Sequence, residues 1–327
     1  MTPHRRRLAA GLLALPLGLA LAAPGARAQE YPTRPVRIIV PFAAGTGPDT
    51  NARQIATKLP AVLGQPVVVE NRPGAAGQIG TEAAAKAAPD GYTLYMGFTS
   101  TISIQPYVYR RLPYDAERDF EPVSLVGTLR SGLLAHPTVA AADVRELVAA
   151  AKARPESLNA ATQGVGTYSH LAGEWFASAT GAKLRFVPYN TSSPYADLLG
   201  GTTQLMFDGM PAAIGNIRAG RLKVLAVTGS DRHPSFPDVP TFAELGLADY
   251  QPIAWIGLFA PAGTPAAIQE RLAAAVAAGA RSPDFVELWR SFGGDPVGST
   301  PAEFRAFIRA DQARWSAVVR QAGVKLD

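Results

Sequence analysis

The sequence contains no cysteine in its 327 residues. Disulfides, thiolate metal sites, cysteine nucleophiles and a lipid anchor on cysteine are therefore excluded. Histidine is scarce, and the four histidines lie far apart without the spacing of a metal-ligand pair: His4, His136, His170 and His233. We expect neither a metal nor a cofactor.

The usual signatures of catalysis are also missing. Gly45-Thr46-Gly47 and Gly164-Val165-Gly166 each lack the third glycine of a dinucleotide fingerprint. There is no GxxxxGK[ST], GxSxG or HExxH motif. A Ser-His-Asp set would have to be assembled from scattered residues. We therefore expect that the protein is not an enzyme, and an enzyme on the same fold stays the weakest alternative.

The positive charge is concentrated at the N-terminus. The chain has 31 basic and 26 acidic residues, but residues 1–28 hold four arginines and no acid, which leaves 27 basic residues against 26 acidic ones. A nearly neutral remainder argues against a nucleic-acid partner. Residues 1–28 also have the layout of a signal peptide: a basic start, an apolar run and Ala26-Arg27-Ala28 as a cleavage site. We expect cleavage after Ala28 and export to the periplasm, without a lipid anchor. The general secretory route is the default, although Arg5-Arg6 would also suit the twin-arginine route.

Apolar runs alternate with helical patterns over the rest of the chain. Strands are predicted at 36–42, 66–70 and 92–98 with helices at about 49–63 and 79–87 between them. This βαβαβ order predicts a parallel, doubly wound sheet. A second α/β unit follows, with strands at 131–135, 158–162, 184–189, 204–207 and 223–228 and helices at 143–153, 170–180, 195–200 and 211–219. The chain then returns through an apolar run at 254–260 to helices at about 266–278, 283–292 and 301–322.

Two glycine loops each connect a strand to a helix, one at 42–50 and one at 164–170. Free backbone N–H groups and the positive end of a helix dipole make such a turn an anion site. The first loop has no Lys, Arg or His, so backbone and hydroxyl groups would hold the anion. Because ligands bind at the carboxyl ends of strands in open α/β sheets, two facing loops predict a clamp for a small carboxylate. A bulky side chain at Gly45 or Gly166 should crowd this clamp.

Several residues near the loops have both a ligand-binding and a structural interpretation. For the acids and the histidine, the structural alternative is a helix cap or a local hydrogen bond. For the tyrosines it is packing rather than stacking on a flat acid, and for the threonine it is a turn cap. These residues are Asp49, Asp208, His170, Tyr168, Tyr189 and Thr99. Trp255 is expected to pack in the core.

Over the whole length after residue 28, the chain resembles the extracytoplasmic solute receptors of the tripartite tricarboxylate transporter, or Bug, family. The order and spacing of short motifs carry the resemblance: Val40-Pro41-Phe42 with Gly45 and Asp49-Thr50, Gly64-Gln65-Pro66 through Asn71-Arg72-Pro73-Gly74, Ala88-Pro89-Asp90-Gly91-Tyr92, Leu112-Pro113-Tyr114-Asp115, His170-Leu171-Ala172-Gly173-Glu174, Leu205-Met206-Phe207-Asp208 and Ala260-Pro261-Ala262-Gly263-Thr264-Pro265.

The resemblance implies a type II periplasmic binding protein with two doubly wound α/β domains, two crossover strands and a ligand cleft that closes like a flytrap. Domain 1 would span 29–128 plus 253–327, and domain 2 would span 129–252. The ligand would be a small carboxylate: a di- or tricarboxylate, an amino acid or an aromatic acid. A two-component membrane permease would be the partner, and we expect a monomer. A sensor that feeds a two-component signalling system stays open as an alternative, because it would use the same closure.

The resemblance places the ligand at both glycine loops and at nearby strand ends. The expected ligand-binding residues are Phe42, Ala44, Gly45, Thr46, Gly47, Asp49, Thr99, Gly164, Val165, Gly166, Thr167, Tyr168, His170, Tyr189 and Asp208. Some positions depart from the family pattern, including Thr46, Val165, Tyr168, Ser169 and the Asn190-Thr191 pair. Because these side chains would line the cleft, the identity of the ligand does not transfer.

Overall fold

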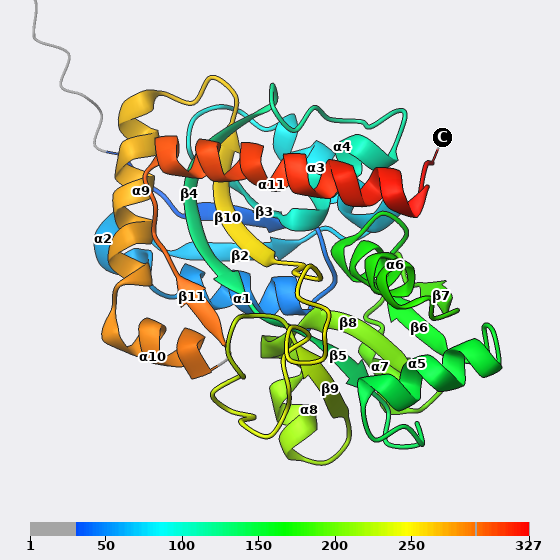
Figure 1. Ribbon diagram of the computed structural model, residues 1–327. Helices are drawn as coiled ribbons and strands as arrows, with labels where there is room; N and C mark the ends of the chain where they lie inside the picture. The colour runs from blue at the N-terminus through cyan, green and yellow to red at the C-terminus, as the bar shows by residue number, and fades with distance from the viewer. Residues whose placement is uncertain (1–30, 292, 327) are drawn as a thin grey trace, which may run out of the picture. The chain divides into compact units, whose positions relative to one another are not determined.

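Two mixed β-sheets with helices on both faces make up the computed structural model (Figure 1). The structure describes residues 31–291 and 293–326, so the expected signal peptide and its cleavage site lie outside the described residues. No helix in this part of the chain combines the length and the apolar character needed to cross a membrane.

The first sheet has the strand order β11-β4-β10-β3-β1-β2. Strand β1 pairs in parallel with β2 and β3, as the βαβαβ pattern predicts. Strand β10, which lies outside that pattern, is antiparallel to both β3 and β4, so the sheet as a whole is mixed. The six strands are β1 (Val36–Val40), β2 (Val67–Asn71), β3 (Thr93–Phe98), β4 (Phe120–Leu129), β10 (Ala254–Pro261) and β11 (Gly294–Pro296).

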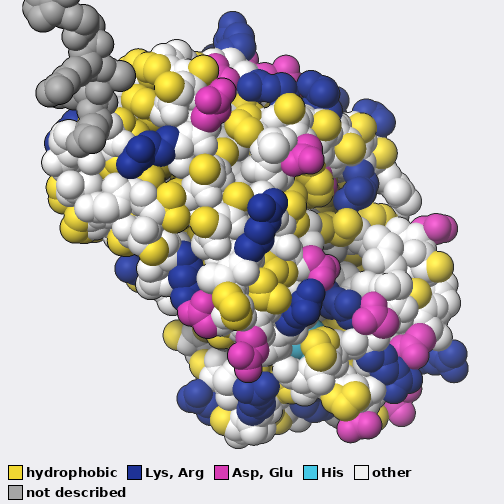
Figure 2. Space-filling view, turned by 90° about the vertical axis from the view of Figure 1, so that its left-hand side faces the viewer, with side chains coloured by type: hydrophobic (Ala, Val, Ile, Leu, Met, Phe, Trp, Pro, Cys, Tyr) yellow, Lys and Arg dark blue, Asp and Glu magenta, His cyan; other side chains and the backbone are white. Residues whose placement is uncertain are grey.

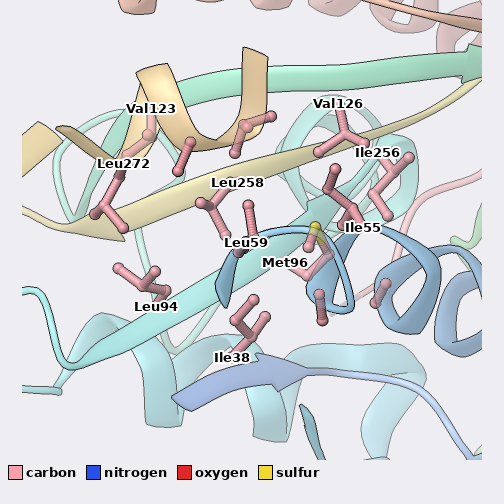
Figure 3. Close-up of a cluster of buried hydrophobic side chains, with 14 of the residues drawn as sticks. Ile38, Ile55, Leu59, Leu94, Met96, Val123, Val126, Ile256, Leu258 and Leu272 are labelled. Carbon is pink, nitrogen blue, oxygen red and sulfur yellow. The ribbon is translucent and has the colours of Figure 1, made fainter. Parts of the chain in front are cut away.

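Alternation along β1 explains how this sheet is covered on two faces. Ile38 belongs to the core beneath the helices of one face, whereas Ile39 belongs to the core on the other face, because successive side chains of a strand point to opposite sides. The first face is covered by α1 (Gly47–Ala56), α2 (Pro60–Leu63), α9 (Ala266–Ala280) and α10 (Pro283–Ser291). Figure 3 shows this core, where Ile38, Met96 and Leu258 from three strands meet Ile55 and Leu272 from two helices. The second face is covered by α3 (Gln78–Ala85) and α11 (Pro301–Ala322).

The second sheet has the strand order β7-β6-β8-β5-β9. Strand β6 is parallel to β7 and β8, whereas β5 is antiparallel to β8 and β9. Its strands are β5 (Ser131–Ala135), β6 (Asn159–Thr162), β7 (Arg185–Pro188), β8 (Leu205–Gly209) and β9 (Lys223–Val227). Helices α5 (Val144–Ala153) and α6 (Tyr168–Thr180) pack on one face, and α7 (Tyr195–Leu199) and α8 (Ile214–Arg218) pack on the other.

Helix α11 links the two sheets. Its first half places Phe304 and Ile308 in the core of the first sheet, and its second half places Trp315 and Val318 in the core of the second sheet. Figure 1 shows the helix running from β4 and β10 to α6. A capping box formed by Thr300 and Glu303 begins it, and the bounds predicted from the sequence are confirmed.

Two predicted elements differ from the structure. The helix expected over 49–63 is interrupted after Ala56, and α2 begins afresh at Pro60, because proline is favoured in the first turn of a helix and disrupts an interior. The helix expected over 211–219 divides into a 3-10 turn, Met210–Ala212, and α8. Five further elements were not predicted: the 3-10 turn Ala75–Gly77, the π-helical segment Thr99–Ile104, α4 (Gln105–Val108), β4 and β11.

Candidate functional site

The strand ends of both sheets meet at two small cavities. We define the inner cavity, of about 40 Å³, by residues from both sheets: Gly47, Pro48, Asn51, Phe98, Thr99, Ser100, Leu129, Gln163, Tyr168, Asp208, Gly209, Ala254 and Trp255. The outer cavity, of about 10 Å³, is lined by Pro41, Phe42, Ala43, Thr46, Pro73, Gln163, Tyr189, Asn190, Thr191 and Ser192. Gln163 lines both cavities and therefore lies between them.

The first glycine loop is held by a carboxylate of its own helix. The Gly45 N–H donates to Asp49 Oδ2 at 2.9 Å, and Asn71 Nδ2 donates to Asp49 Oδ1 at 2.8 Å. Arg53 forms an ion pair with Asp49 at 2.9 Å. Burial opposes ionisation, but the hydrogen bonds from Arg53, Gly45 and Asn71 outweigh it and lower the pKa of Asp49. The Gly45 amide is thus engaged within the loop, and Asp49 is a positioning residue at the third position of α1 rather than its N-cap.

Asp208 brings a second buried carboxylate to the site, at the end of β8. Tyr195 donates to Asp208 Oδ2 at 2.9 Å, and the Gly209 N–H donates to Oδ1 at 2.8 Å. Burial is the main cause that raises the pKa of Asp208 to about 6, partly offset by these two hydrogen bonds. A Cβ placed on Gly47, the first residue of α1, would lie 3.7 Å from both carboxylate oxygens. Asp208 therefore lines the inner cavity. The alternative that it caps a helix is wrong, because the N-caps of the next two helical segments are Gly209 and Ala213.

Two amide side chains at the inner cavity each have one atom that forms no hydrogen bond to the described residues. Asn51 and Gln163 are 4% and 7% exposed. Within the described chain, Asn51 Oδ1 and Gln163 Nε2 form no hydrogen bond. Buried polar atoms are nearly always paired, since leaving one unpaired costs about 1–3 kcal/mol. An acceptor and a donor that both line one cavity are therefore suited to a polar ligand.

The second glycine loop packs against residues from the segments that connect strands of the first sheet. A Cβ on Gly164, at φ +120°, would lie 2.9 Å from Ala76 Cβ, and one on Gly166, at φ +76°, would lie 2.9 Å from the Tyr109 ring. The Tyr109 hydroxyl donates to the Val165 carbonyl at 2.9 Å. These contacts leave no room for side chains at the two glycines, so the loop and the first-sheet side are closed on each other here.

The N-terminus of α6 is likewise tied to the first-sheet side and to itself. The Tyr168 N–H, in the first turn of α6, donates to Ser100 Oγ at 2.8 Å. Ser100 lies just after β3, so this hydrogen bond connects a helix of the second sheet to the first sheet. The Gly166 N–H donates to His170 Nδ1 at 3.3 Å, and the His170 ring stands edge-on to Phe186. His170 therefore makes a structural hydrogen bond, and the Thr167 hydroxyl is turned to the Gly164 carbonyl at 2.7 Å.

The expected ligand-binding residues fall into two groups. Those at the cavities are Phe42, Thr46, Gly47, Thr99, Tyr168, Tyr189 and Asp208. Those that support the loops without lining either cavity are Ala44, Gly45, Asp49, Gly164, Val165, Gly166, Thr167 and His170. Trp255 packs in the core as expected, donating from Nε1 to Asp311 Oδ2 at 2.6 Å, and also lines the inner cavity.

Sequence reasoning missed Asn51 and Gln163 as site residues. Gln163 directly follows β6, just as Thr99 directly follows β3, so the polar residue after each buried strand was the available signal. Asn51 lies one turn inside α1 and lines the cavity because that helix begins beside Asp208 of the second sheet. Nothing in its local sequence distinguishes it from a surface residue.

Comparison with known proteins agrees with this architecture. The model of the tripartite tricarboxylate transporter family receptor matches residues 51–324. Protein BugT from Bordetella pertussis is 40% identical, with 94% of each chain covered. An R. palustris protein solved with adipate has a TM-score of 0.87 at 34% identity, covering 90% of this chain and 99% of its own. MatC from Rhodopseudomonas palustris, solved with bound malate, has a TM-score of 0.84 at 33% identity, covering 88% of this chain and 100% of its own.

These matches extend over nearly the whole described chain, and they combine sequence identity with the same two-sheet fold. The family consists of substrate-binding receptors of the periplasmic binding protein type, not of enzymes. The chain belongs to the tripartite tricarboxylate transporter receptor family.

Proposed function

We propose that this receptor captures a small carboxylate between its two glycine loops and delivers it to a tripartite tricarboxylate-type membrane permease. The observation that carries the proposal is the meeting of strand ends from both sheets around Gln163, whose Nε2 donor is buried and unpartnered. A carboxylate oxygen is a strong acceptor for such a donor. The adipate and malate bound to the two related structures are both carboxylates.

The outer cavity is the place we assign to the ligand's carboxylate. Its lining combines loop one, through Phe42 and Thr46, with the amide and hydroxyl side chains of Asn190, Thr191 and Ser192. The first-loop helix contributes its positive end, which favours an anion by about 0.3–1 kcal/mol. Neutral donors can hold a carboxylate without the desolvation cost of a buried arginine.

Closure of two domains would enclose the ligand. We assign 29–128 plus 253–327 to domain 1 and 129–252 to domain 2, because β4 and β10 belong to the first sheet and β5 to β9 belong to the second. The Tyr109–Val165 and Ser100–Tyr168 hydrogen bonds would then join the domains in the closed state. The surface visible in Figure 2 intersperses basic and acidic side chains, which suits a periplasmic monomer rather than a nucleic-acid binder.

A thermal-shift screen of residues 29–327 against a carboxylate panel tests the proposal, after partial unfolding and refolding to remove any carried-over ligand. A ligand at 100 times its dissociation constant adds about 2.7 kcal/mol to the free energy of unfolding, which raises the melting temperature by several degrees. A flat response across dicarboxylates, tricarboxylates, amino acids and aromatic acids would contradict the proposal.

A further inference from the structure

We propose that the inner cavity selects carboxylates whose other end is a hydrogen-bond donor without negative charge, namely an ammonium or a hydroxyl group. This inference rests on the proposed function, since it concerns the end of the ligand that the outer cavity does not hold. It narrows the ligand class to small amino acids and hydroxy acids and counts against simple dicarboxylates.

Asp208 and Asn51 bring hydrogen-bond acceptors to the inner cavity. Asp208 offers two carboxylate oxygens, each with a lone pair beyond the single hydrogen bond it accepts. Asn51 Oδ1 is a further acceptor that has no partner within the described chain. A ligand ammonium placed between Asp208 and Asn51 could donate to both side chains, whereas a ligand hydroxyl could donate to one of them. An ammonium offers three such hydrogens and a hydroxyl offers one.

A second ligand carboxylate would find little compensation in the same place. No Lys, Arg or His occurs among the described residues that line the inner cavity. Asp208 is 95% buried, and the titratable groups placed against its carboxylate are the hydroxyls of Tyr195 and Tyr168. With a pKa of about 6, its ionised form predominates at neutral pH. Two carboxylates at close range in a buried site disfavour each other's ionised form.

The size of the cavity sets a second limit. Its volume of about 40 Å³ corresponds to roughly three water-sized groups, at about 10–15 Å³ for each. Gly47 lines this space beside Asp208, since a Cβ there would be in van der Waals contact with the Asp208 oxygens at 3.7 Å. The donor end of the ligand is therefore short, while Gln163, which lines both cavities, is placed to contact the carboxylate end.

Calorimetry at pH 7.5 with two matched series of probes tests the inference. One series is 4-aminobutyrate, 4-hydroxybutyrate, succinate and butyrate, and the other is β-alanine, 3-hydroxypropionate, malonate and propionate. Within a series only the distal group changes. In the series whose length fits, the amino and hydroxy acids should bind at least tenfold more tightly than the dicarboxylate and the unsubstituted acid. Asp208→Asn should weaken the amino acid at least tenfold and strengthen the dicarboxylate.

Two further variants keep the test decisive. Asp231→Asn removes an exposed carboxylate that pairs with Arg130 and should leave the order of affinities unchanged. Asn51→Ala removes only the neutral acceptor, and it should weaken the amino acid without affecting butyrate or propionate, even where Asp208→Asn fails to fold. Dicarboxylates that bind as tightly as the donor-ended acids, with Asn51→Ala having no effect, would overturn the inference and leave the proposed function standing. Failure of every probe to bind would count against both.

Discussion

The Tyr195 hydroxyl lies 2.9 Å from Asp208 Oδ2 and donates a hydrogen bond to this buried carboxylate. Tyr195 is the first residue of α7 and Asp208 is the penultimate residue of β8, so the pair fixes a helix start against a strand end on the second sheet. The carboxylate is thereby held beside Gly47 at the start of α1, on the first-sheet side. This pair anchors the polar end of the inner cavity, and several consequences can be measured.

The free energy of unfolding should depend on pH through Asp208. The pKa of its carboxyl is raised from 3.8 to about 6 in the folded protein, mainly by burial. The folded state therefore binds the proton more tightly, and the stabilising effect of protonation is present below pH 3.8 and lost as pH rises through 6. The shift corresponds to about 3 kcal/mol. Denaturant titrations from pH 4 to 7 should show Asp208→Asn gaining most of that free energy, about 2 kcal/mol, relative to the wild type. An equal pH dependence of both proteins would refute this assignment.

Removing the Tyr195 hydroxyl should raise the pKa of Asp208 further. That hydrogen bond stabilises the charged carboxylate and so lowers its pKa, whereas burial raises it. In Tyr195→Phe the lowering effect is lost and the effect of burial remains. Carbon-13 NMR of the aspartate carboxyl, titrated in both proteins, measures the shift directly. Tyr189→Phe is the matched control, because Tyr189 hydrogen-bonds to Asp197 instead. The prediction fails if the Asp208 midpoint in Tyr195→Phe stays at the wild-type value.

Alanine should have different effects at two glycines that both have positive φ. A Cβ on Gly164 would lie 2.7 Å from Asn190 Oδ1 and 2.9 Å from Ala76 Cβ, whereas one on Gly45 would meet nothing within 4 Å. Crowding of the clamp by a bulkier side chain at Gly45 stays a prediction, and the open space around its Cβ means that alanine does not test it. Both variants carry roughly 1–2 kcal/mol of backbone strain. Gly164→Ala should also prevent full closure and weaken ligand binding more than tenfold by calorimetry, while Gly45→Ala stays within threefold. Equal losses in both would show that loop two is not a closing surface.

The Tyr109 hydroxyl should contribute to binding although it touches neither cavity. It donates to the Val165 carbonyl, which joins α4 to the second glycine loop. Tyr109→Phe removes that bond, worth about 0.5–1.5 kcal/mol, and should weaken ligand binding about threefold to tenfold through the closed state. Tyr114→Phe is the control, because its hydroxyl contacts Thr101 and Gln105 on the first-sheet side alone. Calorimetry should show lower affinity only for Tyr109→Phe. A loss of equal size in the control would assign the effect to general destabilisation.

Much of the fold could be predicted from the sequence, because the spacing of apolar residues and the residues that favour turns are local properties of the chain. The helix at 301–322 was predicted with its observed bounds, since Pro301 and Gly323 mark its two ends. Strand β4 was missed because Pro122 and Gly127 interrupt its pattern, and both stand beside irregularities in the pairing of β4 with β10. The antiparallel direction of β10 follows from the return of the chain, which no local pattern encodes.

The candidate site was predictable only in part. The strand-end position of Thr99 and Asp208 pointed to the cavity, because that geometry follows from the α/β pattern. Nothing in the sequence indicated that the Gly45 N–H, which was expected to face the ligand, donates to the Asp49 carboxylate. The unpartnered atoms of Asn51 and Gln163 are properties of the folded chain and cannot be read from residue type.

The most direct test of carboxylate capture compares one acid with its own methyl ester. After the thermal-shift screen has identified the acid that stabilises residues 29–327 most, calorimetry would measure its affinity and that of the ester under the same conditions. We predict that the ester binds at least a hundredfold more weakly, because it lacks the negative charge and one of the acceptor oxygens that the two glycine loops would bind. An ester that binds as tightly as the free acid would contradict the account.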